Sequence, residues 1–266
     1  MTETLPHNRK TRRILITGAS GGLGGALARH YARSDTETGV KLSLWGRDRA
    51  RLEAVAHDCR TAGAQVSVRS LDLADVDGAL AALAGEDAAD PFDLVLLASG
   101  RGDVRASGDL VEDAAMVAAL GTVNFTAPAA MAAAIAARMA ERGSGGIVLV
   151  GSAAAFHALP FAAAYAGTKA GLARFADALR IGVARHGVSV TLVSPGFIDT
   201  AAGRKVPGPK PMLMAPGAVA ARIAQAAETR RAHLVLPWPF AVLRWIDRLL
   251  PGPLRDRVLS SLTPPE

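Results

Sequence analysis

A tyrosine and a lysine stand four residues apart in the segment Tyr165-Ala-Gly-Thr-Lys169. If this segment is helical, the two side chains share one face. An ammonium group beside a phenol favours the phenolate and lowers its pKa from an ordinary value of about 10. A tyrosine tuned in this way can exchange a proton with a carbonyl or alcohol oxygen at neutral pH. By itself such a pair more often belongs to a solvated helix face, so other residues must decide.

A serine and an asparagine precede this pair. Ser152 follows the apolar run 147–150 and lies 13 residues before Tyr165. Its hydroxyl could donate a hydrogen bond to a substrate oxygen and stabilise the charge that develops there. Asn124 lies in a long alanine-rich segment, where an asparagine alone could also merely bend a helix. Together these residue types suit proton transfer during the reduction of a carbonyl.

A glycine-rich segment near the N-terminus suits a cofactor that contains phosphate. Thr17-Gly-Ala-Ser-Gly-Gly-Leu-Gly24 follows an apolar run and precedes a segment with helical spacing. Gly18 permits a tight turn, Gly22 lets the backbone approach a pyrophosphate, and Gly24 allows close packing of helix on strand. Because a second strand ends about twenty residues later, the pattern indicates a dinucleotide site.

These residues must be positioned by short strands that alternate with longer helices. Strand length and branched residues mark 14–16, 41–45, 65–68, 93–97, 147–150, 188–193 and 233–236. Helical spacing marks segments that include 23–33, 49–61, 114–139, 161–185 and 216–229. This alternation closes a parallel sheet through right-handed crossovers. The predicted fold is α/β: a Rossmann-type, doubly wound parallel sheet of about seven strands with helices on both faces.

The order of these motifs resembles that of the short-chain dehydrogenase/reductase family over roughly residues 10–200. The resemblance is carried by Thr17-Gly-x-x-x-Gly-x-Gly24, Asn124, Ser152, Tyr165-x-x-x-Lys169 and Pro195-Gly-Phe-Ile-Asp-Thr200. It implies that Tyr165 is the acid-base group and that Lys169 lowers its pKa and binds the nicotinamide ribose. It further implies that Ser152 polarises the substrate oxygen and that Asn124 holds the helix open for a proton relay. The cofactor contacts that it implies are Gly18, Ser20, Gly22, Leu23, Gly24, Arg47, Asp72, Leu73, Ser99, Gly100, Tyr165, Lys169, Pro195, Gly196, Ile198 and Thr200.

The end of the second strand favours NADP over NAD. Gly46 stands where members of the family that select NAD carry a carboxylate for the ribose 2′-hydroxyl. Arg47 beside it can pair with a 2′-phosphate. Asp48 is the dissenting residue, although it could equally cap the helix that follows. Asp72 matches the family position that contacts the adenine amino group.

Two further segments bear on the substrate. Leu97-Ala-Ser-Gly100 replaces the Asn-Asn-Ala-Gly of many members, which retains Gly100 but loses asparagine hydrogen bonds and puts the stability of this turn in doubt. The proline-rich segment 207–214 cannot form a regular helix or central strand. We predict that it is a lid whose Met212, Leu213 and Met214 cover a partly hydrophobic substrate. The alternative is a solvated loop.

Composition and charge exclude other classes of protein. The hydrophobic share is 50% and the charged share 20%, which suits a globular core and excludes disorder for the body. The net charge of +6 is spread along the chain without a basic tract that interleaves aromatics, so no nucleic-acid partner is expected. No metal-ligand cluster and no membrane span are expected either. The single cysteine, Cys59, and the absence of a signal sequence favour a cytoplasmic protein.

The expected organisation is a polar tail at 1–12, a catalytic NADP-binding domain at 13–236 and a helical extension at 237–266. The extension reads as one or two amphipathic helices broken at Pro251-Gly-Pro253. We expect it to pack on its own domain; a subunit interface, a lid or a membrane contact are the alternatives. The predicted protein is an NADP(H)-dependent oxidoreductase, expected to be a homodimer, that interconverts carbonyls and alcohols. A catalytically silent NADP-binding sensor of the same fold is the alternative.

Overall fold

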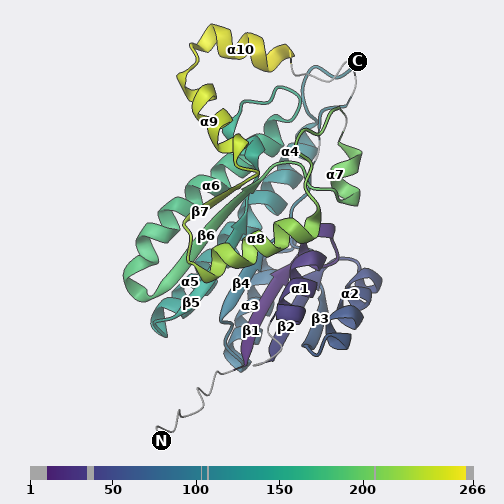
Figure 1. Ribbon diagram of the computed structural model, residues 1–266, viewed down its shortest axis with the longest axis vertical. Coiled ribbons are helices and arrows are strands. Elements are labelled where there is room, and N and C mark those ends of the chain that lie inside the picture. Colours follow the sequence, from purple (N-terminus) through teal and green to yellow (C-terminus); the bar gives the residue numbers. More distant parts are fainter. Residues whose placement is uncertain (1–10, 35–38, 103, 107, 207, 262–266) are drawn as a thin grey trace, which may run out of the picture.

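The computed structural model describes residues 11–34, 39–102, 104–106, 108–206 and 208–261. Within them a seven-stranded sheet has the order β3-β2-β1-β4-β5-β6-β7, and every neighbouring pair is parallel (Figure 1). The chain reverses its direction of winding between β1 and β4, which confirms the doubly wound sheet. The strands are β1 (Arg12–Thr17), β2 (Val40–Gly46), β3 (Gln65–Ser70), β4 (Leu94–Leu97), β5 (Gly145–Val150), β6 (Val188–Pro195) and β7 (His233–Leu236).

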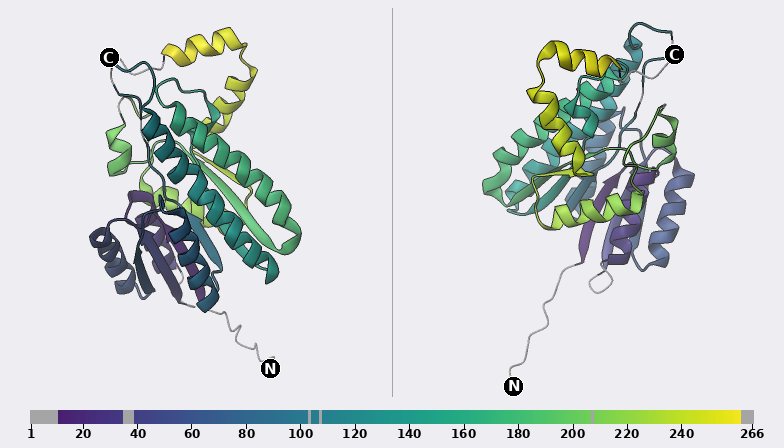
Figure 2. Two further views of the ribbon diagram at one scale, coloured as in Figure 1. Left: turned by 180° about the vertical axis from the view of Figure 1, so that it is seen from behind. Right: turned by 45° about the horizontal axis from the view of Figure 1, so that its top comes forward.

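Helices cover both faces of the sheet (Figure 2). On one face, α1 (Gly22–Ser34), α2 (Arg49–Thr61) and α8 (Pro216–Glu228) bury residues such as Leu27, Val55 and Ile223. On the other face, α3 (Val76–Ala89), α5 (Ala127–Glu141) and α6 (Ala163–Val183) bury a second apolar cluster. The sheet is therefore covered on both faces except at the edge strand β3, whose residues are exposed or half-buried. The carboxyl ends of the strands remain open for a site. Helix α3 was not among the segments marked by the sequence, although Asp75 caps it by accepting from Gly78 N.

One helix is long and apolar enough to cross a membrane, judged by length and composition alone. It runs from Ala114 to Glu141 through α4 (Ala114–Gly121), the π-helical turn η1 (Thr122–Thr126) and α5. This helix lies against α3, α6 and β5, and Met131, Ile135 and Met139 are buried in the core. Its apolar face is thus accounted for by the fold.

The start of α2 settles the structural role of Asp48. Its carboxylate accepts a hydrogen bond from Arg51 N at 3.0 Å and so caps the helix. The same carboxylate pairs with the Arg51 guanidinium at 3.1 Å. The capping alternative is confirmed, and Asp48 has a function in the fold that is separate from cofactor choice.

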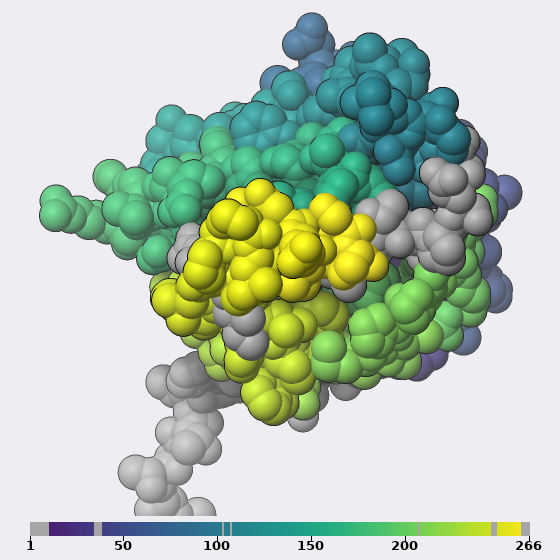
Figure 3. Space-filling model, turned by 90° about the horizontal axis from the view of Figure 1, so that it is seen from above, coloured from purple at the N-terminus to yellow at the C-terminus, as the bar shows by residue number. Residues whose placement is uncertain are grey.

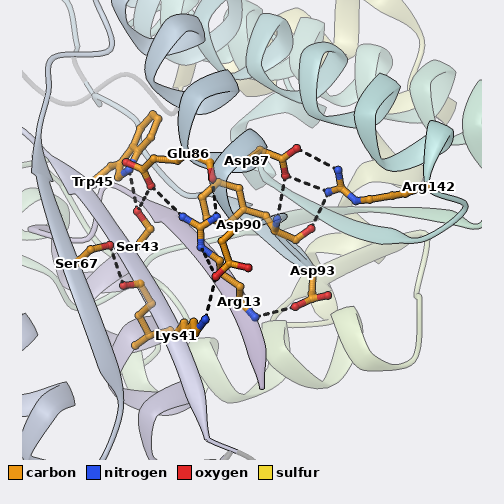
Figure 4. Close-up of polar contacts among 12 residues, drawn as sticks. Arg13, Lys41, Ser43, Trp45, Ser67, Glu86, Asp87, Asp90, Asp93 and Arg142 are labelled. Carbon is orange, nitrogen blue, oxygen red and sulfur yellow. Dashed lines mark hydrogen bonds and ion pairs between the residues drawn. The ribbon is translucent and has the colours of Figure 1, made fainter. Parts of the chain in front are cut away.

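A buried carboxylate ties α3 to α5 at the opposite end of the sheet (Figure 4). Asp87 is buried and accepts hydrogen bonds from Arg138 Nε at 2.6 Å, Arg142 Nη1 at 3.0 Å and Phe92 N at 2.9 Å. Burial by itself raises the pKa of Asp87, but these donors outweigh it and lower the pKa below 3.8. The network holds the amino ends of the strands together and lies far from their carboxyl ends.

Shorter helices lie beyond the carboxyl ends of the strands, at the top of the view in Figure 1. They are α7 (Ala201–Lys205), α9 (Pro239–Leu249) and α10 (Gly252–Ser261). The predicted break at Pro251 falls between α9 and α10 and is confirmed. Of the predicted polar tail, residues 1–10 lie outside the described residues, and Pro207 of the proline-rich segment does too.

Candidate active site

Helix α6 places the Tyr-Lys pair beside the end of β5. Lys169 is buried, and its Nζ donates a hydrogen bond to the carbonyl oxygen of Val150, the last residue of β5, at 2.9 Å. Ser152 lies two residues further on and caps the 3₁₀ turn η2 (Ala153–Phe156) by accepting from Ala154 N at 3.1 Å. Burial lowers the pKa of Lys169 to about 8. The ammonium is thus bound to the end of β5, two residues before the serine that is predicted to contact the substrate.

The pKa of Tyr165 is controlled by two opposing effects. Burial raises its pKa, and a hydrogen bond with Ser152 lowers it in part. The net direction is upward, which is opposite to the lowering expected from Lys169. The reason is that removal of water from the phenol outweighs the single hydrogen bond that favours its ionised form. In the chain alone Tyr165 is therefore held as the neutral phenol.

Asn124 lies at the centre of the π-helical turn η1. Its Oδ1 accepts from Arg101 N and its Nδ2 donates to Arg101 O, both at 2.8 Å. The wider turn is closed by Ala127 N, which donates to the Thr122 carbonyl five residues earlier. The helix is opened where the sequence placed the asparagine, and the side chain itself fixes the segment after β4.

Gly100 brings Asn124 and Lys169 to one place. A Cβ atom added to Gly100 would lie 3.2 Å from Lys169 Nζ and 3.4 Å from Asn124 Oδ1. The turn that lacks the usual asparagines is held by other groups, because Ser99 N donates to Thr17 Oγ1 at 3.2 Å. Asn124, Ser152, Tyr165 and Lys169 are thus gathered at the carboxyl ends of β4 and β5.

The glycine-rich turn is shaped to admit a dinucleotide. Gly18 has φ +69°, and a Cβ there would lie 2.9 Å from Ser99 Cα. A Cβ at Gly24 would lie 2.2 Å from the Gly18 carbonyl oxygen. Helix α1 begins at Gly22 and has no acidic residue in its first turn, so its free amide groups suit an anion. The residues present fit the pyrophosphate of a nicotinamide dinucleotide.

The end of β2 carries an exposed cation. Arg47 Nη1 lies 4.0 Å from Asp72 Oδ2, and both side chains are largely open to solvent. A Cβ at Gly46 would lie 2.7 Å from Ser20 Oγ, which brings the glycine-rich turn next to this strand end. Leu73 is buried below them. Arg47, Asp72 and Ser20 therefore surround one corner of the sheet, where the adenosine half of a dinucleotide would lie.

The Pro195-Gly196 segment closes the other side. Gly196 N donates to Leu236 O at 2.6 Å, and a Cβ on Gly196 would lie 2.3 Å from the ring of Phe240. Ile198 pairs with Met214 in an isolated parallel bridge. Thr200 caps α7 through Gly203 N at 3.0 Å, and its methyl group lies where a Cβ of Gly22 would be. This segment thus joins the glycine-rich turn to the proline-rich segment.

Several contacts in the site had no signal in the sequence. The Val150 and Arg101 backbone groups act through atoms that every residue possesses. Phe240 comes from the extension, far along the chain, and only its aromatic type marked it. Among the described residues no three His, Cys, Asp or Glu side chains gather as metal ligands.

Comparison with known proteins identifies the family. A family model described as short chain dehydrogenase matches residues 12–209. The chain belongs to the short-chain dehydrogenase/reductase family. It is an oxidoreductase of that family, whose fold binds a nicotinamide cofactor.

Members of the family resemble this chain over most of its length. An uncharacterized oxidoreductase of Myxococcus xanthus is 33% identical over 252 residues, covering 94% of this chain and 97% of the relative. A hydroxysteroid 11-beta-dehydrogenase 1-like protein of Gallus gallus is 33% identical, covering 96% and 88%. A short-chain dehydrogenase from Sphingobium yanoikuyae, solved with NADPH, is 26% identical with a TM-score of 0.76, covering 96% and 98%. Three other relatives are longer, and the chain spans 59%, 58% and 57% of their length.

Proposed function

We propose that this oxidoreductase uses NADP(H) to transfer a hydride between the nicotinamide and the carbon of a carbonyl or secondary alcohol. The observation that carries the proposal is the buried Lys169, on the helix that also carries Tyr165, whose ammonium donates to the carbonyl of Val150 two residues before Ser152. Two hydroxyls then converge on one point, where a single substrate oxygen could accept from both. Two hydroxyl donors directed at one oxygen suit a reaction in which that oxygen gains a proton.

The chain's own residues divide the work of the reaction. Bound nicotinamide would supply or accept the hydride. Tyr165 Oη donates its proton to the substrate oxygen in reduction, and the neutral phenol favoured by burial is the form that can donate. Ser152 Oγ donates a hydrogen bond to the same oxygen and stabilises its developing charge. Lys169, still protonated at pH 7 with its pKa of about 8, favours the phenolate that remains.

Asn124 supports the return of the proton. Its side chain is fully engaged with Arg101, so its part is to keep the helix open in the turn next to Lys169. An opened turn exposes backbone carbonyls that no longer bond within the helix. We propose that such a carbonyl accepts a hydrogen bond from a water, and that a proton from solvent passes through this water to Lys169 and Tyr165.

The end of β2 supports NADP over NAD. The exposed guanidinium of Arg47 has only a long 4.0 Å contact to Asp72, so a phosphate can compete for it. Gly46 supplies no carboxylate that would repel that phosphate. The Sphingobium yanoikuyae enzyme solved with NADPH is consistent with this choice.

The substrate is proposed to be partly hydrophobic. Met212 and Leu213 are exposed between α7 and α8, while Met214 packs on the core. Met212 and Leu213 directly precede Met214, which pairs with Ile198, and so lie close enough to the Pro195–Thr200 segment to fold over an occupied site. The Gallus gallus relative, whose name refers to a hydroxysteroid dehydrogenase, agrees with an apolar substrate class. A homodimer and a cytoplasmic location stay predictions of the sequence.

The test is NADPH oxidation across ketones, aldehydes, and sugar-like and lipid-like carbonyls, followed by Tyr165→Phe with the best substrate. Tyr165→Phe should lower kcat about 10²–10⁴-fold and leave NADPH affinity nearly unchanged. A loss below about tenfold would exclude Tyr165 as the acid. The alternative, a silent NADP-binding sensor, predicts NADPH binding without turnover of any carbonyl in the set.

A further inference from the structure

Helix α9 turns large apolar side chains toward solvent and an arginine toward the protein, whereas a surface helix usually does the reverse. Phe240 packs on Gly196, and the guanidinium of Arg244 lies 5.3 Å from the ring centroid of Phe156 in η2. These two residues are four apart, so one face of α9 lies on the loops of the active site. The face of α9 that packs on the protein therefore carries a cation, Arg244.

The opposite side of α9 carries an exposed apolar stripe, which consists of Val242, Trp245 and Leu249 and is extended by Trp238, the residue just before the helix. The spacing of four, three and four residues places them on one side of a helix. Trp238 is 71% exposed, Trp245 58% and Leu249 81%. Leu254 and Val258 continue the exposed apolar surface onto α10. Large apolar side chains gathered in this way mark a surface that is covered by something else.

The same end of the molecule also contains the segment between α7 and α8 (Figure 3). Figure 3 looks onto it, with α9 and α10 in yellow beside the green segment that contains α7. The segments after β6 and β7 carry most of the exposed large apolar side chains among the described residues. Residues 201–214 contain Arg204, Lys205 and Lys210 and no acidic residue, although Arg204 pairs with Asp199, just before them, at 2.7 Å. Residues 237–261 contain four arginines and two aspartates; Arg244 among them lies on the inner face of α9, and Arg255 pairs with Asp256 at 3.1 Å.

We propose that this face of the protein binds an anionic phospholipid surface, into which the stripe on α9 inserts. Tryptophan favours the boundary between water and hydrocarbon, and lysine and arginine nearby favour acidic headgroups. A second copy of the chain fits less well. A two-fold contact through the stripe would set the cations of one copy against those of the other.

The proposal is independent of the reaction, because it concerns only whether the protein binds to a lipid surface. The fluorescence of the protein gives a direct probe, since Trp45 is buried and Trp238 and Trp245 are exposed. Insertion should shift tryptophan emission to shorter wavelength with vesicles of phosphatidylcholine that contain phosphatidylglycerol. Pure phosphatidylcholine vesicles should give a weaker shift, and added salt should reduce the shift with acidic vesicles.

Vesicle sedimentation distinguishes binding through the stripe from nonspecific adsorption of the protein to vesicles. The double variant Trp245→Ser/Leu249→Ser should bind acidic vesicles at least about tenfold more weakly than the parent chain. Ile181→Ser is the matched control, because Ile181 on α6 is 68% exposed and lies outside the proposed surface. Its binding should be unchanged.

Three outcomes would overturn the proposal. The first is an absence of binding to acidic vesicles by the parent chain, and the second is equal binding by the stripe variant. The third is a dimer, seen by analytical ultracentrifugation, that the stripe variant dissociates while no vesicle binding occurs. A second copy, not lipid, would then cover the stripe. Retained far-ultraviolet circular dichroism in each variant shows that any loss does not come from unfolding.

Discussion

The ammonium of Lys169 donates to the carbonyl of Val150 at 2.9 Å, and so a side chain of α6 is bound to the last residue of β5. This contact fixes the distance between the helix that carries Tyr165 and the strand end that carries Ser152. It also gives the buried ammonium one hydrogen-bond partner where water is excluded. The position of the proton donor thus depends on a backbone atom of the sheet.

The lowered pKa of Lys169 predicts a pH-dependent stability. A lysine with a pKa of about 8 in the folded chain and 10.5 in the unfolded chain makes the unfolded chain bind more protons between these values. Stability therefore rises with pH through that window. Relative to Lys169→Met, the parent chain should gain about 2–3 kcal/mol of unfolding free energy from pH 7 to pH 10. Urea denaturation at both pH values measures this, and an equal difference at both would contradict it.

Gly100 should be intolerant of a single methyl group. In Gly100→Ala the new Cβ would lie 3.2 Å from Lys169 Nζ, so the ammonium must shift by a few tenths of an ångström. We expect kcat to fall about tenfold while the free energy of unfolding changes by less than about 1.5 kcal/mol. Gly102→Ala is the control, since no atom lies within 4 Å of its added Cβ. Steady-state kinetics of the two variants test this prediction. Equal kcat values would show that the position of Gly100 does not affect the reaction.

Arg47→Ala should remove most of the preference for NADPH over NADH. A charge-assisted hydrogen bond is worth about 1.5–3 kcal/mol, so the ratio of the two dissociation constants should fall about tenfold or more. Arg60→Ala is the control, because Arg60 lies in the last turn of α2. Fluorescence titration with each cofactor measures the ratio. An unchanged ratio in Arg47→Ala would defeat the assignment of Arg47.

The buried carboxylate of Asp87 should dominate stability at the opposite end of the sheet. Asp87→Asn leaves Arg138 and Arg142 without their anion and should cost about 2–4 kcal/mol. The folded-state pKa of Asp87 is lowered, so this difference is present above about pH 5 and narrows as the pH falls below 3.8. Asp90→Asn, at a partly exposed ion pair with Lys41, should cost less than about 1 kcal/mol. Thermal unfolding at pH 7 compares the two variants, and a loss in Asp87→Asn as small as that in Asp90→Asn would contradict the prediction. The same comparison at pH 3, below the ordinary pKa of 3.8, measures the narrowing.

The segment 208–213 should be protected when the site is filled. Trypsin is expected to cleave after Lys205, just before this segment, in the chain alone and more slowly with NADP and a substrate analogue together. Cleavage after Arg185, in the exposed turn η3 (Ala184–His186), should stay constant. Equal rates of cleavage after Lys205 under both conditions would mean that the segment only connects α7 to α8, and would remove the argument for a lid.

The sequence predicted the sheet and the gathering of the four catalytic candidates because both depend on strong local signals. Branched apolar runs, glycines and helical spacing fix where strands end, and parallel strands bring their carboxyl ends to one edge. Asn124 marked the widened turn, and Asp48 marked the start of α2.

Other features could not be predicted, for identifiable reasons. The pKa direction of Tyr165 depends on burial, which spacing along a helix does not show. The contact of Phe240 with Gly196 joins residues that are far apart in the chain. The stripe on α9 was visible as an amphipathic pattern, but which side faces outward follows only from the packing of Phe240 and Arg244.

The single thiol of the chain makes the protein an unusually simple subject for site-directed labelling. Cys59 is fully buried in α2, and burial raises the pKa of its thiol to about 11. Maleimides react with thiolates, so the folded protein should be inert to them without removal of any native residue. A cysteine introduced at Leu249 or Lys210 would then be the one reactive position. The slow modification of Cys59 itself would measure how often the domain unfolds transiently.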